Sequence, residues 1–178
     1  AATVPPGPSW RLQGRSWPTF GRIWRTTWRL IEEGTPASSI AIFARGRQLL
    51  NQVARELQAR GIPFEHYEKR DGRKSIDIFE PSVKLITTLS AKGIEFPTVF
   101  IAGVSERLFP SRGRSPEQLE QARRMLYTAM MRAAYRLTLS AVRAQASGLL
   151  RLIQQAGAHG RRCTVGGHNR PPLLRCEA

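Results

Sequence analysis

The segment 83–103 constrains the fold more than any other part of the chain. It opens and closes with short, almost continuous apolar runs, at 83–86 and 99–102, which are typical of strands buried on both faces of a parallel sheet. Between the runs lies a polar loop that carries Lys92, Gly93 and Glu95. Open α/β sheets bind their ligands at the carboxyl ends of such strands. The segment therefore predicts two buried parallel strands and a ligand-binding loop.

Helical and strand patterns alternate along the rest of the chain. Apolar residues recur at helical spacing in two early segments, and Ser115-Pro116 is a favourable start for a third helix. The predicted helices are 20–33, 48–60, 117–134 and 148–156, the further strands are 40–44, 64–67 and 137–142, and 69–74 is a charged turn. This alternation predicts an α/β fold, with a parallel sheet flanked by helices and right-handed crossovers.

Length and composition indicate one domain with two tails. A chain of 178 residues buries one good core. Residues 1–19 are rich in Pro, Gly, Ser and Arg without periodicity, and Gly, Arg and Pro dominate from 157 onward. We expect a flexible N-terminal tail at 1–19, a folded domain at 20–156 and a flexible basic tail at 157–178.

The charge balance points to a polyanionic partner. Lys and Arg number 28 against 13 Asp and Glu, a formal net charge of +15, which favours nucleic acid over a merely solvated or ribosomal-type basic surface. No apolar run is long enough for a bilayer and no cleavable leader is recognisable, so we expect no membrane partner and a cytoplasmic location. Cys163 and Cys176, with His159 and His168, match no common zinc spacing, so no metal site is predicted.

Three linked segments resemble the UvrD/Rep/PcrA-type superfamily 1 DNA helicases. Residues 87–96 are similar to motif V, Thr-x-His-x-x-Lys-Gly-Leu-Glu-Phe, and residues 119–139 are similar to motif VI. Between them, 103–111 is similar to the Gly-x-x-x-Gly-x-Phe-Pro-Ser connection. The resemblance covers about 21–152. It implies the second RecA-like lobe of a helicase motor, a parallel P-loop NTPase-type sheet without its own P-loop.

The resemblance also implies roles for individual residues. Arg132 stands where the family carries its catalytic arginine finger. Glu95 matches the carboxylate that binds the nucleotide ribose, and Gly93 and Tyr127 are the further ATP-binding candidates. The DNA-binding candidates are Arg45, Thr87, Ser90 and Lys92. Two departures weaken the match, because Leu89 replaces the family histidine of motif V and Met131 replaces the threonine before the finger.

The P-loop pattern itself is missing from the sequence. None of the four lysines follows a glycine in a Gly-x-x-x-x-Gly-Lys-Ser/Thr setting. ATP and Mg²⁺ are therefore expected to bind mainly to an N-terminal RecA-like lobe in cis, and single-stranded or partly duplex DNA is the expected partner. The first residue is Ala1, which favours an excised fragment. The alternative is a stand-alone, non-catalytic, basic nucleic-acid-binding module that keeps a degenerate helicase fold.

Overall fold

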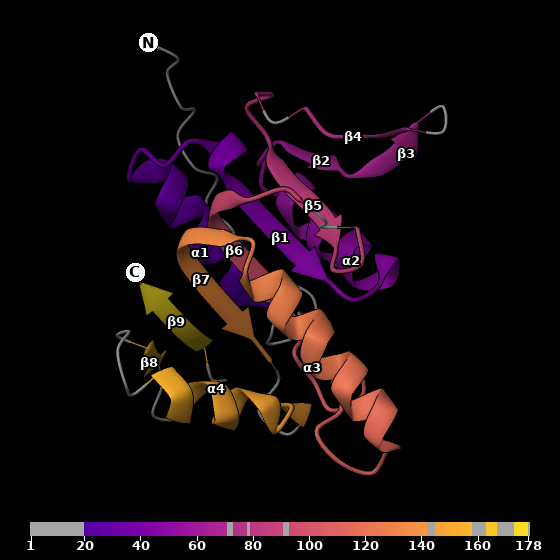
Figure 1. The fold of residues 1–178 in the computed structure, drawn as a ribbon. Helices are drawn as coiled ribbons and strands as arrows, with labels where there is room; N and C mark the ends of the chain where they lie inside the picture. The colour runs from indigo at the N-terminus through magenta and orange to yellow at the C-terminus, as the bar shows by residue number, and fades with distance from the viewer. Residues whose placement is uncertain are drawn as a thin grey trace.

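The structure, a computed structural model, is built as three layers, with helices on both faces of a central sheet (Figure 1). It describes residues 20–70, 73–77, 79–90, 93–141, 145–157, 163–166 and 173–177. None of the described helices is long and apolar enough to span a membrane.

The sheet has seven strands in the order β2-β5-β1-β6-β7-β9-β8. From β2 to β7 every pairing is parallel, whereas β9 runs antiparallel to both β7 and β8. The strands are β1 Ile40–Ala44, β2 Phe64–His66, β5 Val83–Thr87, β6 Phe96–Ala102, β7 Ala133–Ser140, β8 Cys163–Gly166 and β9 Leu173–Glu177. The five parallel strands confirm the predicted α/β fold.

Each face of the sheet carries its own hydrophobic core. Ile40, Ile42 and Ala44 of β1 pack with α1 (Phe20–Glu32) and α2 (Arg47–Gln58). Ala41 and Phe43 of the same strand belong to the opposite core, with α3 (Pro116–Met130) and α4 (Leu149–Gly157). Because side chains alternate along a strand, a strand that serves both cores is apolar throughout. All five β1 residues are buried, which confirms the two-faced burial predicted for such runs.

Three expectations about local structure need correction. The predicted charged turn at 69–74 is a small hairpin of β3 (Glu68–Arg70) and β4 (Arg73–Ser75). The third helix ends at Met130 instead of 134, because Ala133 pairs with Phe96 and starts β7. Alanine favours helix, but here sheet pairing overrides local propensity. The predicted unstructured segment 157–178 contributes β8 and β9.

The two cysteines lie opposite each other in the β8–β9 pairing. The N-terminal segment 1–19, His159 and His168 lie outside the described residues.

Candidate functional site

The motif V loop connects two opposite edges of the sheet. Ala44 is level with both Thr87 and Ala102, so the ends of β1, β5 and β6 share the carboxyl edge. Phe96 starts β6 six positions earlier (102 − 96 = 6), about 20 Å away at ~3.3 Å per residue. Since β5 and β6 run parallel, the chain between them must return from the carboxyl edge to the amino edge. The loop that the sequence predicts as one site is therefore divided between two edges.

Arg132 and Glu95 meet at the amino edge. The amide of Phe96 donates a 2.8 Å hydrogen bond to the carbonyl oxygen of Arg132, and Phe96 pairs with Ala133. Glu95 and Arg132 thus each precede the start of adjacent strands, which are spaced ~4.8 Å apart. The Arg132 side chain is half-buried, and its Nε donates to the Thr128 carbonyl oxygen at 3.3 Å. Glu95 is exposed.

The other two ATP-binding candidates lie near the same edge. Tyr127 is one turn before the end of α3, with its carbonyl oxygen accepting a hydrogen bond from Met131 N, and its side chain is 62 % exposed. Gly93 lies two residues before Glu95 with φ of +78°, in the left-handed region that favours glycine. A Cβ at Gly93 would meet nothing within 4 Å, so backbone conformation and not space favours glycine there.

Three of the four DNA-binding candidates gather at the carboxyl edge. Arg45 follows β1 directly, and its guanidinium carbon lies 5.8 Å from the centroid of the Phe109 ring. At the end of β5, the Thr87 hydroxyl donates to the Ser90 hydroxyl at 2.8 Å. The amide of Thr88 donates to the Ala44 carbonyl oxygen at 2.9 Å, which joins the ends of β5 and β1. Lys92 lies outside the described residues.

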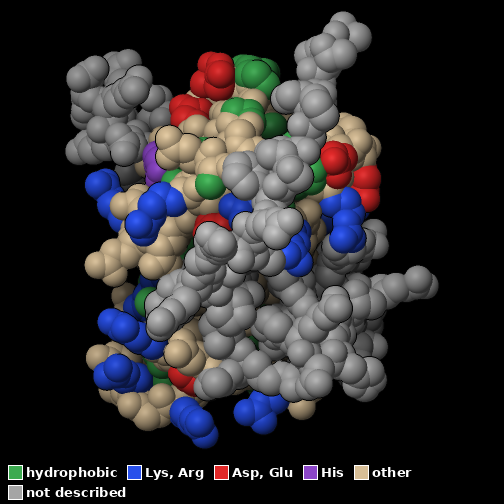
Figure 2. All heavy atoms as spheres, turned by 180° about the vertical axis from the view of Figure 1, so that it is seen from behind, with side chains coloured by type: hydrophobic (Ala, Val, Ile, Leu, Met, Phe, Trp, Pro, Cys, Tyr) green, Lys and Arg blue, Asp and Glu red, His purple; other side chains and the backbone are tan. Residues whose placement is uncertain are grey.

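The two edges differ in charge. The comparison concerns the charged residues in the described loops that adjoin the strands at each edge, including the helix residue next to each loop. The carboxyl edge carries Arg45, Arg47, Arg107, Arg112 and Arg114 with Glu106, whereas the amino edge carries Glu32, Glu33, Asp77, Glu80 and Glu95 with Arg60 and Arg132. In Figure 2 the basic side chains lie mainly along the left and lower margins and the acidic ones mainly at the top. The carboxyl edge is therefore the one suited to a polyanion.

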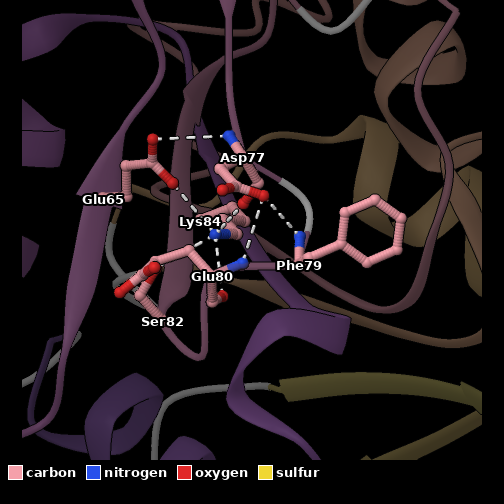
Figure 3. A network of polar contacts seen from close by, with 6 residues as sticks. All are labelled: Glu65, Asp77, Phe79, Glu80, Ser82 and Lys84. Carbon is pink, nitrogen blue, oxygen red and sulfur yellow. Dashed lines mark hydrogen bonds and ion pairs between the residues drawn. The ribbon is translucent and has the colours of Figure 1, made fainter.

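The sequence patterns do not predict that the lysine in β5, the strand that leads into the motif V loop, is buried. Lys84 of β5 is fully buried, and its Nζ donates to Glu65 Oε2 at 2.9 Å, Ser82 Oγ at 3.0 Å and the Glu80 carbonyl oxygen at 3.0 Å, as well as to the Asp77 carbonyl oxygen (Figure 3). The sequence signal was a single cation inside an apolar strand. Buried charges are paired and hydrogen-bonded, so a polar network around it was foreseeable, although its partners were not.

A second missed residue holds the connection after β6. The Glu106 carboxylate accepts 2.8 Å hydrogen bonds from Ser111 N and Gly148 N and a further bond from Ser111 Oγ. Partial burial opposes ionisation, yet these bonds and the nearby Arg112 keep the pKa of Glu106 below its ordinary value. A Cβ at Gly148 would lie 2.5 Å from Ser111 Oγ, so the close approach requires glycine. Nothing local in the sequence marks this arrangement.

The comparisons with known proteins agree with the motifs. Residues 68–144 match the family model of the UvrD-like helicase C-terminal domain. DNA helicase II of Escherichia coli K12 is 42 % identical over 79 residues, which cover 43 % of this chain and 11 % of the relative. The ATP-dependent DNA helicase PcrA of Staphylococcus epidermidis is 46 % identical over 55 residues, 29 % of this chain and 8 % of the relative.

One solved structure supports the fold. The crystal structure of the C-terminal domain of a possible DNA helicase from Lactobacillus plantarum WCFS1 superposes with a TM-score of 0.54 at 24 % identity, covering 74 % of this chain and 70 % of that one.

The parallel sheet with helices on both faces defines this chain as an α/β protein that shares its fold with the domain solved from Lactobacillus plantarum. Residues 68–144 are similar to the UvrD-like helicase C-terminal domain, and the relatives that match this part of the chain are DNA helicases. The matched segment is a small part of the curated relatives, 11 % of the first of them.

Proposed function

We propose that this domain is the C-terminal motor lobe of an ATP-dependent DNA helicase. It supplies an arginine finger, a ribose contact and part of a single-stranded DNA channel, and it requires a P-loop lobe for activity. The observation that carries the proposal is the hydrogen bond between Phe96 N and Arg132 O, because it holds the finger candidate beside the ribose candidate Glu95.

At the amino edge the domain acts on a nucleotide held mainly by the other lobe. The Arg132 guanidinium stabilises the charge that develops on the γ-phosphate, and Glu95 accepts a hydrogen bond from the ribose. Gly93 and Tyr127 complete this side of the site. The described part of the chain offers no cluster of three metal-ligating residues. The sequence also lacks the Gly-x-x-x-x-Gly-Lys-Ser/Thr loop that cradles phosphates, so the phosphates and Mg²⁺ are assigned to the P-loop lobe.

At the carboxyl edge the domain binds the backbone of a single DNA strand. The Arg45 guanidinium lies against the Phe109 ring, a cation–π contact that limits its freedom. The hydroxyls of Thr87 and Ser90 are donors of the kind that commonly bind phosphate oxygens, and Lys92 adds a cation to the same loop. These contacts fix position on the strand and carry no sequence information.

The loop after β5 couples the two edges. It starts at the DNA candidates Thr87 and Ser90 and ends at Glu95 beside the nucleotide candidates. Closure of the two lobes on ATP displaces the Glu95 end of this loop and shifts the DNA contacts at the Thr87 and Ser90 end. Hydrolysis then releases the shifted grip, so that each cycle moves the DNA strand by a step.

A non-catalytic nucleic-acid-binding module is the second candidate. It is favoured by Leu89 and Met131, which replace polar residues of the family and are 63 % and 52 % exposed. Because these exposed side chains do not pack in the hydrophobic core, core packing does not explain why they replace the polar residues of the family. A module of this kind binds DNA without responding to nucleotide.

The deciding experiment compares the isolated domain with a protein that joins it to a P-loop lobe. The isolated domain is expected to bind single-stranded DNA and to show no ATPase activity, since it lacks the phosphate cradle. The two-lobe protein is expected to hydrolyse ATP faster when DNA is added. DNA binding that is unaffected by nucleotide, together with no hydrolysis in the two-lobe protein, would establish the module instead.

A further inference from the structure

The connection after β6, which leaves the sheet at the same edge as Arg45, carries three arginines. Arg107, Arg112 and Arg114 are all exposed, and none forms an ion pair with a carboxylate in the described part of the chain. The same connection contributes Phe109, on whose ring Arg45 rests. These three arginines are therefore a direct continuation of the basic carboxyl edge.

The backbone of this connection is held at several points. Phe109 and Pro110 are buried, and the Ser147 hydroxyl donates to the Phe109 carbonyl oxygen at 2.5 Å. Glu106 bonds to Ser111 N and Gly148 N, which ties the middle of the connection to the start of α4. Anchors at Ser111 and Ser115, on either side of Arg112 and Arg114, reduce the ordering cost of binding, because less of the chain remains to be fixed.

The strand order gives the direction in which these groups follow one another. β5, β1 and β6 are neighbours in the sheet, about 4.8 Å apart, so Thr87, Arg45 and Gly103 stand in a row across the carboxyl edge. The connection 103–115 continues the row beyond β6. A nucleic-acid strand lying across this edge passes Ser90 and Thr87 first and Arg45 next.

We propose that the connection 103–115 is a second phosphate-binding element. A DNA strand that crosses the carboxyl edge from β5 toward β6 continues along this connection. Arg107, Arg112 and Arg114 bind its phosphates, and Glu106 is the positioning residue that holds their backbone. The Glu106 carboxylate is held mainly by backbone and hydroxyl donors, and its attraction to Arg112 is the smallest of the effects that lower its pKa. This inference rests on the proposed function, because it extends the same DNA contact.

The test measures binding of oligothymidylate to the chain by fluorescence anisotropy over a range of salt concentrations. The variant is Arg112→Ala with Arg114→Ala. The charge-matched control is Arg29→Ala with Arg55→Ala, which removes two exposed arginines from α1 and α2 toward the amino edge. Circular dichroism melts of both variants verify folding, which exposed side chains should not disturb.

The two lost phosphate contacts are expected to lower the log–log salt slope by about 1.4, at about 0.7 per contact, and the affinity roughly tenfold near 0.15 M salt. The control should change the slope far less. Oligonucleotide length adds a second readout, because a strand of about four nucleotides is too short to occupy the whole row, whereas one of about sixteen is not. The loss should therefore be confined to the longer strand.

The outcomes separate this inference from the proposed function. An unchanged slope in the Arg112/Arg114 variant, with a drop of about 0.7 in an Arg45→Ala variant, refutes the second element and leaves the DNA channel in place. An equal loss in the variant and the control shows a diffuse charge effect and also refutes the element. If neither Arg45→Ala nor the double variant alters binding, the DNA-binding edge itself is wrong.

Discussion

The amide of Phe96 donates to the carbonyl oxygen of Arg132 at 2.8 Å, and this backbone bond joins the end of motif V to the arginine of motif VI. The bond continues the parallel pairing of β6 with β7, in which Phe96 faces Ala133. Because it is a main-chain contact, it persists whatever side chain stands at position 132. The position of the arginine is thus set by the sheet, while its guanidinium stays available for a ligand.

Replacement of Arg132 by Ala should abolish hydrolysis without unfolding the domain. Its side chain makes one hydrogen bond to a described residue, from Nε to the Thr128 carbonyl oxygen at 3.3 Å. In a two-lobe protein, steady-state ATPase should fall by roughly 10³-fold, as for other arginine fingers, with ATP affinity mostly kept. Arg132→Lys should recover little, because an ammonium lacks the planar fork that spans two phosphate oxygens.

Arg55→Ala is the matched control for this variant. Arg55 is an exposed arginine of α2 whose Nε donates to the Asn51 carbonyl oxygen at 3.4 Å, the same local contact that Arg132 makes. Its replacement should leave turnover near that of the parent protein. Near-normal turnover in the Arg132→Ala protein would show that the finger is misassigned.

Lys84 and Glu65 should behave as a coupled pair in a double-mutant cycle. Lys84→Met leaves the Glu65 carboxylate without its partner at 2.9 Å and should lower the free energy of unfolding by about 3 kcal/mol. This value is toward the lower end for buried ion pairs, because the Glu65 side chain is 33 % exposed. Lys84→Met with Glu65→Gln should cost less than the sum of the single changes, since no unpaired charge remains. Urea denaturation of the three variants measures the coupling, and strictly additive values would mean that the two residues do not interact.

Glu106→Gln should lower the folding stability at neutral pH, and the stability of the variant should change less as the pH falls. The pKa of Glu106 is depressed from its ordinary value of 4.5, so its ionised form stabilises the fold above that pH, and this contribution is lost as pH falls through the folded-state pKa. At pH 7 the variant should lose about 1.5 kcal/mol, the scale of hydrogen bonds to a charged group, and the difference should shrink below about pH 4.

Glu120→Gln provides the comparison for Glu106→Gln. Glu120 forms an exposed i,i+4 ion pair with Arg124 at 2.8 Å on α3. Pairs of this kind contribute about 0.5 kcal/mol or less, so its urea midpoint should barely move. A loss at Glu106 no larger than at Glu120 would mean that the carboxylate does not hold the connection.

The sheet and its helices were predictable because their signals are local. The apolar run of β1 predicts burial on both faces, and Ser115 with Pro116 predicts the start of α3, where Ser115 forms a capping box with Gln118. The end of α3 was not predictable in this way. Whether Ala133 continues the helix or starts β7 depends on a strand more than thirty residues earlier, where Phe96 supplies the hydrogen bond.

Motif similarity predicts which residues belong to the candidate site, but it does not predict how they are arranged. Motif similarity singles out Thr87, Ser90, Glu95 and Arg132 together, yet it does not show that the first two and the last two lie on opposite edges. That separation follows from the parallel direction of β5 and β6, each of which pairs in parallel with β1. Glu106 was missed for the same reason, because its partner Gly148 lies on a distant segment.

Leu89→His tests whether the motif V departure limits coupling between DNA and nucleotide. Leu89 is 63 % exposed at the carboxyl edge, beside the Thr87–Ser90 hydroxyl pair. Replacing an exposed apolar residue should change stability by no more than about 0.5 kcal/mol, so the effect on function can be measured without a folding cost. An imidazole there supplies a hydrogen-bond donor next to the proposed phosphate contacts. In a two-lobe protein, DNA should stimulate ATPase more strongly in the variant than in the parent. If single-stranded DNA affinity rises while the stimulation of ATPase by DNA is unchanged, position 89 acts in DNA binding alone. If neither quantity changes, the histidine is dispensable in this lobe.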